Sequence, residues 1–258
     1  TPNDTTYKEA LKTTAGFTDE QATNFANTYK VVRTYTDSAT GLSATLFEVG
    51  GHKTLAIRGT ESWSITDYLT NSDLALVGMT SQSDSLQNFY NQLRSDNIIS
   101  STEQITVTGH SLGGFLAQVF TVNNLVSVDH AYTYAAPGVG GFYIGNLLGS
   151  VLGSTPFLPI TNIQGIEPIS QFGLKLGQIV AVPIRDHGIK SLSDALSGLI
   201  NSGTTLFPAQ STLPFVGDFI NNMMAYLRYT FNTAEASVKS SPIILDLDGD
   251  GVETTGVS

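Results

Sequence analysis

The most constraining feature of this sequence is an apolar segment that ends in a glycine-rich turn around a serine. The residues are Ile105-Thr-Val-Thr-Gly-His-Ser-Leu-Gly-Gly114. Gln104 to Thr108 is rich in β-branched residues and reads as a short buried strand. Apolar residues then recur at helical spacing as far as Asn123, namely Leu112, Phe115, Leu116, Val119, Phe120 and Val122. The pattern predicts a strand, a tight turn with Ser111 at its tip, and a helix.

A serine at the tip of such a turn exposes its hydroxyl above the sheet. The first N–H groups and the positive end of the next helix then point at whatever the hydroxyl attacks. Gly109-His-Ser-Leu-Gly113 fits the G-x-S-x-G pattern of this nucleophile elbow. A motif this short also arises by chance, so the flanking strand and helix carry the prediction. Ser111 is the candidate nucleophile, and the alternative is an ordinary serine in a glycine-rich turn.

Composition limits the other classes of function. The 258 residues, 41% of them hydrophobic, are enough for one main domain with a full core. Cysteine is absent, which leaves serine, histidine and carboxylates for covalent catalysis. A net charge of −10 without a basic cluster argues against a nucleic acid partner. The start, Thr1-Pro2-Asn3, shows neither Met nor a signal peptide, which fits a processed or excised fragment.

Residues 141–160 form an apolar stretch about as long as a bilayer span. Its glycines and prolines make a poor transmembrane helix and favour a buried or apolar loop, so we expect no transmembrane segment.

Strand and helix signals alternate along the chain. Thr18-Asp-Glu-Gln21 is a capping box that predicts a helix. Glycines 50 and 51 predict a tight turn between two extended segments. The predicted strands are Val31 to Tyr35, Leu42 to Val49, Lys53 to Ile57, Ala131 to Ala136, Ile160 to Gln164 and Gln178 to Ile184, and later helices are Ile189 to Ile200 and Phe215 to Phe231. We therefore expect an α/β fold with a mostly parallel central sheet, an antiparallel N-terminal edge and helices on both faces.

A serine nucleophile needs an imidazole base, and the chain has four histidines. His52 lies in a hairpin, His110 points away from the serine within the elbow, and His130 opens a strand. His187 follows a strand and lies in a loop at the carboxyl edge of the sheet, so it is the candidate base.

The acid that orients the base follows the nucleophile in chain order. Glu167 comes directly after the strand Ile160 to Gln164 and before Pro168, at the correct edge of the sheet. Asp186 adjoins His187, and neighbouring side chains point apart. Asp129 lies at the wrong end of its strand. Glu167 is the first choice for the acid, and Asp186 is the alternative.

Two N–H groups are needed to stabilise an oxyanion. One belongs to Leu112, directly after the nucleophile. Thr60, which follows an early strand and Gly59, is the candidate for the second, against the alternative of an ordinary turn.

Several of these motifs, in this order, resemble the class 3 lipase family over roughly Ser43 to Leu196. The motifs are Ala56-Ile-Arg-Gly-Thr60, Trp63, Asp67-Tyr-Leu69, Val107-Thr-Gly-His-Ser-Leu-Gly-Gly114, Asn162-Ile-Gln-Gly-Ile-Glu-Pro168 and His187-Gly188. The similarity is closest to lipase-like domains of large secreted bacterial calcium-dependent proteins. It implies an α/β-hydrolase fold and hydrolysis of lipid esters, either triacylglycerol or phospholipid. It also implies secretion by a route that needs no signal peptide.

The resemblance assigns Ser111 as nucleophile, Glu167 as acid, His187 as base, and Thr60 and Leu112 as oxyanion donors. The family usually has Asp where this chain has Glu167. The resemblance implies a lid over Glu61 to Leu74, in which apolar side chains alternate with hydroxyls; a docked surface helix is the alternative. The expected acyl-chain surface comprises Phe142, Leu147, Leu148, Val151, Leu152, Phe157 and Leu158.

The C-terminal segment 241–258 differs in composition from residues 1–240. Asp246, Asp248 and Asp250, followed by Gly251, reproduce the first half of a calcium loop. The twelfth position, where an EF-hand has Glu, is Val257. We expect no cofactor for catalysis and a structural Ca²⁺ at these aspartates, against the alternative of a solvated acidic tail. Two rival functions remain: an esterase or acyltransferase for small esters, and a catalytically silent, calcium-stabilised interaction module of a larger exported protein.

Overall fold

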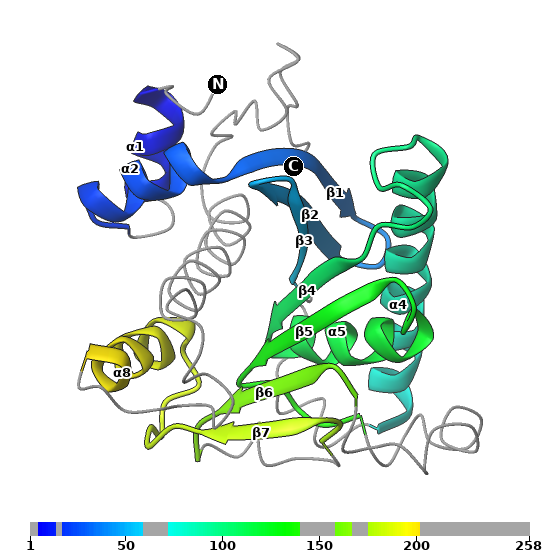
Figure 1. The fold of residues 1–258 in the computed structure, drawn as a ribbon. Coiled ribbons are helices and arrows are strands. Elements are labelled where there is room, and N and C mark those ends of the chain that lie inside the picture. The colour runs from blue at the N-terminus through cyan, green and yellow to red at the C-terminus, as the bar shows by residue number, and fades with distance from the viewer. Residues whose placement is uncertain (1–4, 14–16, 59–71, 140–157, 167–174, 202–258) are drawn as a thin grey trace.

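A seven-stranded sheet with helices on both faces forms the centre of the molecule (Figure 1). The computed structural model describes residues 5–13, 17–58, 72–139, 158–166 and 175–201. The strands follow one another across the sheet in chain order, from β1 to β7. The predicted α/β architecture, with its antiparallel N-terminal edge, is confirmed.

The antiparallel edge consists of β1 (Lys30–Asp37), β2 (Leu42–Val49) and β3 (His52–Arg58). Val49 pairs with His52, so only two glycines connect β2 to β3. Gly50 and Gly51 have φ of 57° and 83°, the left-handed values that a two-residue hairpin turn requires at both positions. The turn predicted from this glycine pair is therefore present.

The remaining strands run parallel to β3: β4 (Ile105–His110), β5 (Val128–Tyr134), β6 (Ile160–Gln164) and β7 (Gln178–Ala181). Two of them end earlier than predicted. Strand β5 stops at Tyr134 because Ala135 takes a left-handed φ of 44°. Strand β7 stops before Pro183, which has no N–H to donate to the sheet. Strand β4 extends two residues past the predicted Thr108, which brings His110 into the sheet.

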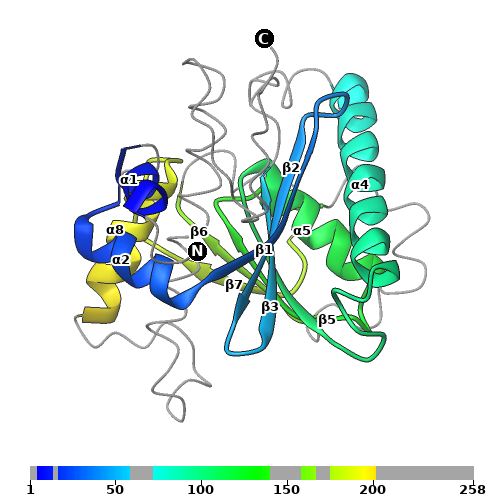
Figure 2. The same ribbon diagram turned by 90° about the horizontal axis from the view of Figure 1, so that it is seen from above.

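Helices α4 (Ser72–Ser95) and α5 (Leu112–Asn123) cover one face of the sheet (Figure 2). They connect β3 to β4 and β4 to β5. Right-handed crossovers that advance in one direction leave both helices on the same side. The opposite face carries α1 (Thr5–Thr13), α2 (Asp19–Thr28) and α8 (Ile189–Asn201). None of the helices described is long and apolar enough to cross a membrane.

Strand alternation divides the core into two clusters. Leu55 and Ile57 of β3 pack with α4 and α5, whereas Ala56 between them packs with α1, α2 and α8. Phe25 of α2 meets Phe47 of β2 edge-to-face, with ring centroids 5.9 Å apart. Both sheet faces are therefore buried.

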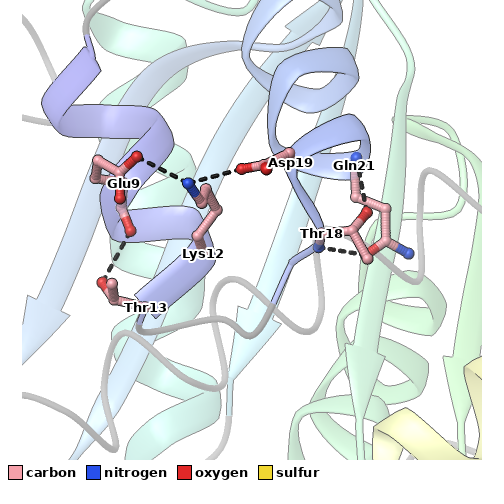
Figure 3. Close-up of polar contacts among 6 residues, drawn as sticks. All are labelled: Glu9, Lys12, Thr13, Thr18, Asp19 and Gln21. Carbon is pink, nitrogen blue, oxygen red and sulfur yellow. Dashed lines mark hydrogen bonds and ion pairs between the residues drawn. The ribbon is translucent and has the colours of Figure 1, made fainter.

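Helix α2 begins at the predicted capping box (Figure 3). The Thr18 hydroxyl accepts from the Gln21 N–H at 3.2 Å, and the Gln21 side chain accepts from the Thr18 N–H at 3.0 Å. Lys12 lies between Glu9 and Asp19, with Nζ–O distances of 2.9 and 2.7 Å. The ammonium thus joins α1 to the first turn of α2.

Candidate active site

Ser111 lies between the end of β4 and the start of α5, with φ 55° and ψ −125°. A non-glycine residue in this conformation is strained and needs support from its surroundings. The Ser111 N–H donates to the carbonyl of Tyr134 at the end of β5, at 2.9 Å, and the Ser111 carbonyl accepts from Gly114 and Phe115. The backbone on both sides of Ser111 is therefore held in place.

Two glycines allow the strand and the helix to meet this closely. A Cβ on Gly109 would lie 2.2 Å from the carbonyl oxygen of Gly113. A Cβ on Gly114 would lie 2.6 Å from the Cβ of Ala136 and 2.8 Å from the carbonyl oxygen of Gly109. Any side chain at either position would push α5 away from β4 and change the direction of Ser111.

The N-terminal end of α5 faces the serine. Leu112 is the first residue of the helix, so its N–H is among the donors that a helix leaves without an intrahelical acceptor. These N–H groups carry the positive end of the helix dipole. The Leu112 N–H is thus suited to the oxyanion role predicted for it.

His187 is brought to Ser111 from 76 positions further along the chain. Its Nε2 lies 2.9 Å from the Ser111 Oγ, and both residues are partly buried. His187 stands in the loop between β7 and α8, at the carboxyl end of the parallel strands. An imidazole nitrogen at this distance can take the proton of the hydroxyl.

Asp186 is engaged with the start of α8. Its Oδ1 accepts from the Gly188 N–H at 2.9 Å, and its Oδ2 accepts from the Ser191 hydroxyl. The bond from Ser191 and then the bond from Gly188 lower the pKa of the Asp186 carboxyl. Both carboxylate oxygens of the alternative acid therefore have partners, one in its own loop and one in the first turn of α8.

Glu167 and Thr60 lie outside the described residues, but the strands that precede them are described. The Ile166 N–H donates to the carbonyl of Ile184 at 2.8 Å, and a Cβ on Gly165 would lie 2.8 Å from that same carbonyl oxygen. The segment that leads to Glu167 thus runs beside the segment that leads to His187. Strand β3 ends at Arg58, which pairs with His110 next to the serine. Both candidates follow strand ends that adjoin the site.

His110 contacts the loop of the candidate base, which the sequence analysis missed. Its Nε2 donates to the His187 carbonyl at 2.9 Å, and the two ring centroids are 5.0 Å apart. Burial, together with the nearby His187, lowers the pKa of His110 to about 3. The apolar pattern predicts that the strand ends at Thr108, whereas β4 continues to His110. If alternation is continued beyond Thr108, then Thr106, Thr108 and His110 share one face of the strand.

The sequence matches the Tle-like phospholipase domain, described as phospholipase-like, over residues 3–203. The chain belongs to this family. Membership and the observed sheet agree with the lipase-like α/β-hydrolase predicted from the motifs. No curated protein sequence matches the phospholipase-like chain.

Solved lipase structures resemble part of the phospholipase-like chain. Lip2 lipase from Yarrowia lipolytica is 21% identical, with TM-score 0.47, over 61% of this chain and 66% of its own. A Rhizomucor miehei lipase propeptide complex is 16% identical, with TM-score 0.40, over 61% and 58%. The lipase from Rhizopus microsporus var. chinensis is 17% identical, with TM-score 0.45, over 68% and 70%. The chain thus spans less than two thirds of the first two lipases.

The other predicted elements of this phospholipase-like chain are only partly described. Ser72 to Leu74, the end of the predicted lid, open α4, while residues 61–71 lie outside the description. Of the predicted acyl-chain surface only Leu158 is described, and it is buried in the core beside α4 and α5. Asp246, Asp248 and Asp250 lie beyond both the described residues and the matched range. Among the described residues, no three His, Asp or Glu side chains gather into a metal site.

Proposed function

We propose that this chain hydrolyses carboxylic esters of lipids through an acyl-enzyme on Ser111. The distance of 2.9 Å between the His187 Nε2 and the Ser111 Oγ is the observation that carries the proposal. His187 takes the hydroxyl proton while the Oγ forms a bond to the ester carbonyl carbon. The oxyanion that results accepts a hydrogen bond from the Leu112 N–H, with Thr60 as the proposed second donor.

Collapse of this intermediate breaks the bond to the alcohol, which leaves with the proton held by His187. Water then attacks the acyl group, gives its proton to His187, and releases the fatty acid as Ser111 regains its hydrogen. The same imidazole serves as base and then acid in each half of the cycle. No step requires a metal or an organic cofactor.

Glu167 remains our proposal for the acid beside His187. The hydrogen bond between Ile166 and Ile184 supports it, because this bond draws the two loops together at the sheet edge. The partners of Asp186 also support it, since both of its carboxylate oxygens already accept hydrogen bonds, from Gly188 and Ser191. A carboxylate at the base fixes the tautomer and stabilises the imidazolium.

For the substrate we propose a phospholipid before a triacylglycerol, because the matching family is described as phospholipase-like. An apolar lid over the site would make activity rise sharply once substrate forms a lipid surface. Initial rates should therefore jump at the solubility limit for long-chain esters and saturate smoothly for short ones. Smooth saturation for both would argue against the lid and leave the hydrolase intact.

A fluorophosphonate probe tests the nucleophile, since the probe bonds only to an activated hydroxyl. We expect labelling of the wild type and none of Ser111→Ala. Ser95→Ala is the matched control, because Ser95 is an exposed serine whose hydroxyl bonds only to the Gln92 carbonyl in its own helix. Wild-type protein that resists labelling would refute the proposal and favour the silent interaction module.

A substrate panel then separates the remaining alternatives. Preference for phospholipid or triacylglycerol over short soluble esters supports the lipid substrate, and release of fatty acid to water excludes an acyltransferase. We propose that the enzyme acts outside the cell and binds a structural Ca²⁺ at Asp246, Asp248 and Asp250. The spacing of these aspartates and the resemblance to exported bacterial proteins support both proposals.

A further inference from the structure

His110 occupies a buried position beneath the loop that carries the proposed base. Its side chain is 7% exposed, and its Nε2 lies 2.9 Å from the carbonyl oxygen of His187. A carbonyl only accepts, so the His110 Nε2 carries the hydrogen. This bond joins the residue before the nucleophile to the backbone of the residue that activates it.

We propose that His110 is a positioning residue, which holds the His187 backbone through its Nε2–H so that the His187 ring stays within reach of Ser111. The proposal rests on the function proposed above. It assigns a task to the residue between Gly109 and the nucleophile that the elbow motif itself leaves open.

The surroundings of the loop explain why such a bond matters. Before His187, the loop is held by the hydrogen bond from Ile166 to Ile184. After His187, the loop is held by the hydrogen bonds that Gly188 and Ser191 donate to the Asp186 carboxylate. The bond from His110 holds the carbonyl of His187 itself, from the side of β4.

Imidazole suits this position because it is rigid and can stay neutral. Burial keeps the ring uncharged, so the imidazolium that forms on His187 during catalysis meets no second positive charge at 5.0 Å. The ring also belongs to β4, whose backbone is bonded to strands on both sides. The donor therefore moves with the elbow, and the distance between base and nucleophile stays constant.

Two substitutions at His110 test the proposal. His110→Gln keeps an N–H at about the position of Nε2, whereas His110→Leu keeps the volume and removes the donor. We expect His110→Leu to lower kcat on a short-chain ester by about 10- to 100-fold with KM unchanged, since small displacements of catalytic groups have effects of this size. His110→Gln should restore most of kcat.

His130 provides the matched control. It is a partly buried histidine whose Nε2 also makes a hydrogen bond, 2.9 Å to the Thr161 Oγ1, but it lies four residues before the end of β5. His130→Leu and His130→Gln should leave kcat within about threefold of the wild type. An equal loss of kcat in His130→Leu would mean that general destabilisation explains the effect and would overturn the proposal.

Hydrogen exchange provides a readout that needs no activity. In His110→Leu, amides of residues 185–188 should exchange at least tenfold faster than in the wild type, and His110→Gln should slow them again. Unchanged exchange, or faster exchange without loss of kcat, would refute the positioning role while Ser111 labelling still supported the hydrolase. Absence of labelling in the wild type would refute the hydrolase and the positioning role together.

Discussion

Lowering the pH should destabilise this protein through His110. The ring is buried, and both burial and the neighbouring His187 lower its pKa from 6.5 to about 3. Between these two values the unfolded chain binds a proton at His110 and the folded chain does not. The stability that depends on a neutral His110 is therefore fully present above pH 6.5, and it is lost progressively as the pH falls towards 3.

The expected size follows from the depressed pKa. Each unit of pH within this window is worth about 1.4 kcal/mol, so at pH 4.5 the His110 ring should lower the free energy of unfolding by about 3 kcal/mol. Other groups titrate over the same range, and they are common to the wild type and to His110→Gln. The difference between these two proteins isolates the contribution of the ring.

Urea unfolding at pH 7.5 and pH 4.5 measures this difference. Between the two pH values, the free energy of unfolding of the wild type should fall by about 3 kcal/mol more than that of His110→Gln. His52→Gln serves as the control for the loss of a histidine, since His52 is exposed. Equal losses in wild type and His110→Gln, within about 0.5 kcal/mol, would show that the buried ring does not remain neutral and would refute the reasoning.

Three further predictions concern the acid, the elbow and the C-terminal segment. Glu167→Gln should lower kcat by orders of magnitude and Asp186→Asn by less than tenfold; near-normal turnover in Glu167→Gln would transfer the role to Asp186. Gly114→Ala should destabilise the fold by about 1–3 kcal/mol through the clash with Ala136, whereas Gly198→Ala, with nothing near its Cβ, should stabilise helix α8 by up to about 1 kcal/mol. Denaturation curves that rank these two variants the other way would contradict the packing argument. Millimolar Ca²⁺ should raise the melting temperature of the whole chain but not of a variant with Asn at the candidate ligands Asp246, Asp248 and Asp250. An unchanged melting temperature of the wild type would favour a solvated acidic tail.

The elements that the sequence predicted well are those with a local signal. The capping box at Thr18, the glycine pair at 50 and 51, and the strand and helix around Ser111 each fix their own backbone. His187 is the candidate base by elimination, because the chain has four histidines and this one follows a strand at the carboxyl edge, and its ring lies 2.9 Å from the Ser111 hydroxyl. Local sequence signals were enough to predict these elements, because a parallel sheet places the carboxyl ends of its strands at one edge.

The contact between His110 and His187 was not predicted, and the reason is physical. Apolar character ends at Thr108, but strand pairing with β3 and β5 continues through Gly109 and His110. Backbone hydrogen bonding does not depend on the hydrophobicity of the side chain. The pattern of apolar residues therefore assigns Gly109 and His110 to the turn. The direction of the His110 side chain depends on this continuation, and so does its contact with a loop 77 positions away.

In this parallel sheet, most residues that stabilise the fold differ from the residues proposed to carry out the reaction. Ser111 follows β4 directly and His187 follows β7 by a short loop, while the segments that lead to Thr60 and Glu167 leave β3 and β6 at the same edge. Parallel strands place all four carboxyl ends together, so one edge collects groups that are far apart in sequence. Most members of the core clusters on the two faces belong to strands and helices rather than to the loops at this edge. Substitutions of the loop residues should therefore alter activity with little change in the free energy of unfolding, and His110 is the exception because it belongs to the strand and to the site at once.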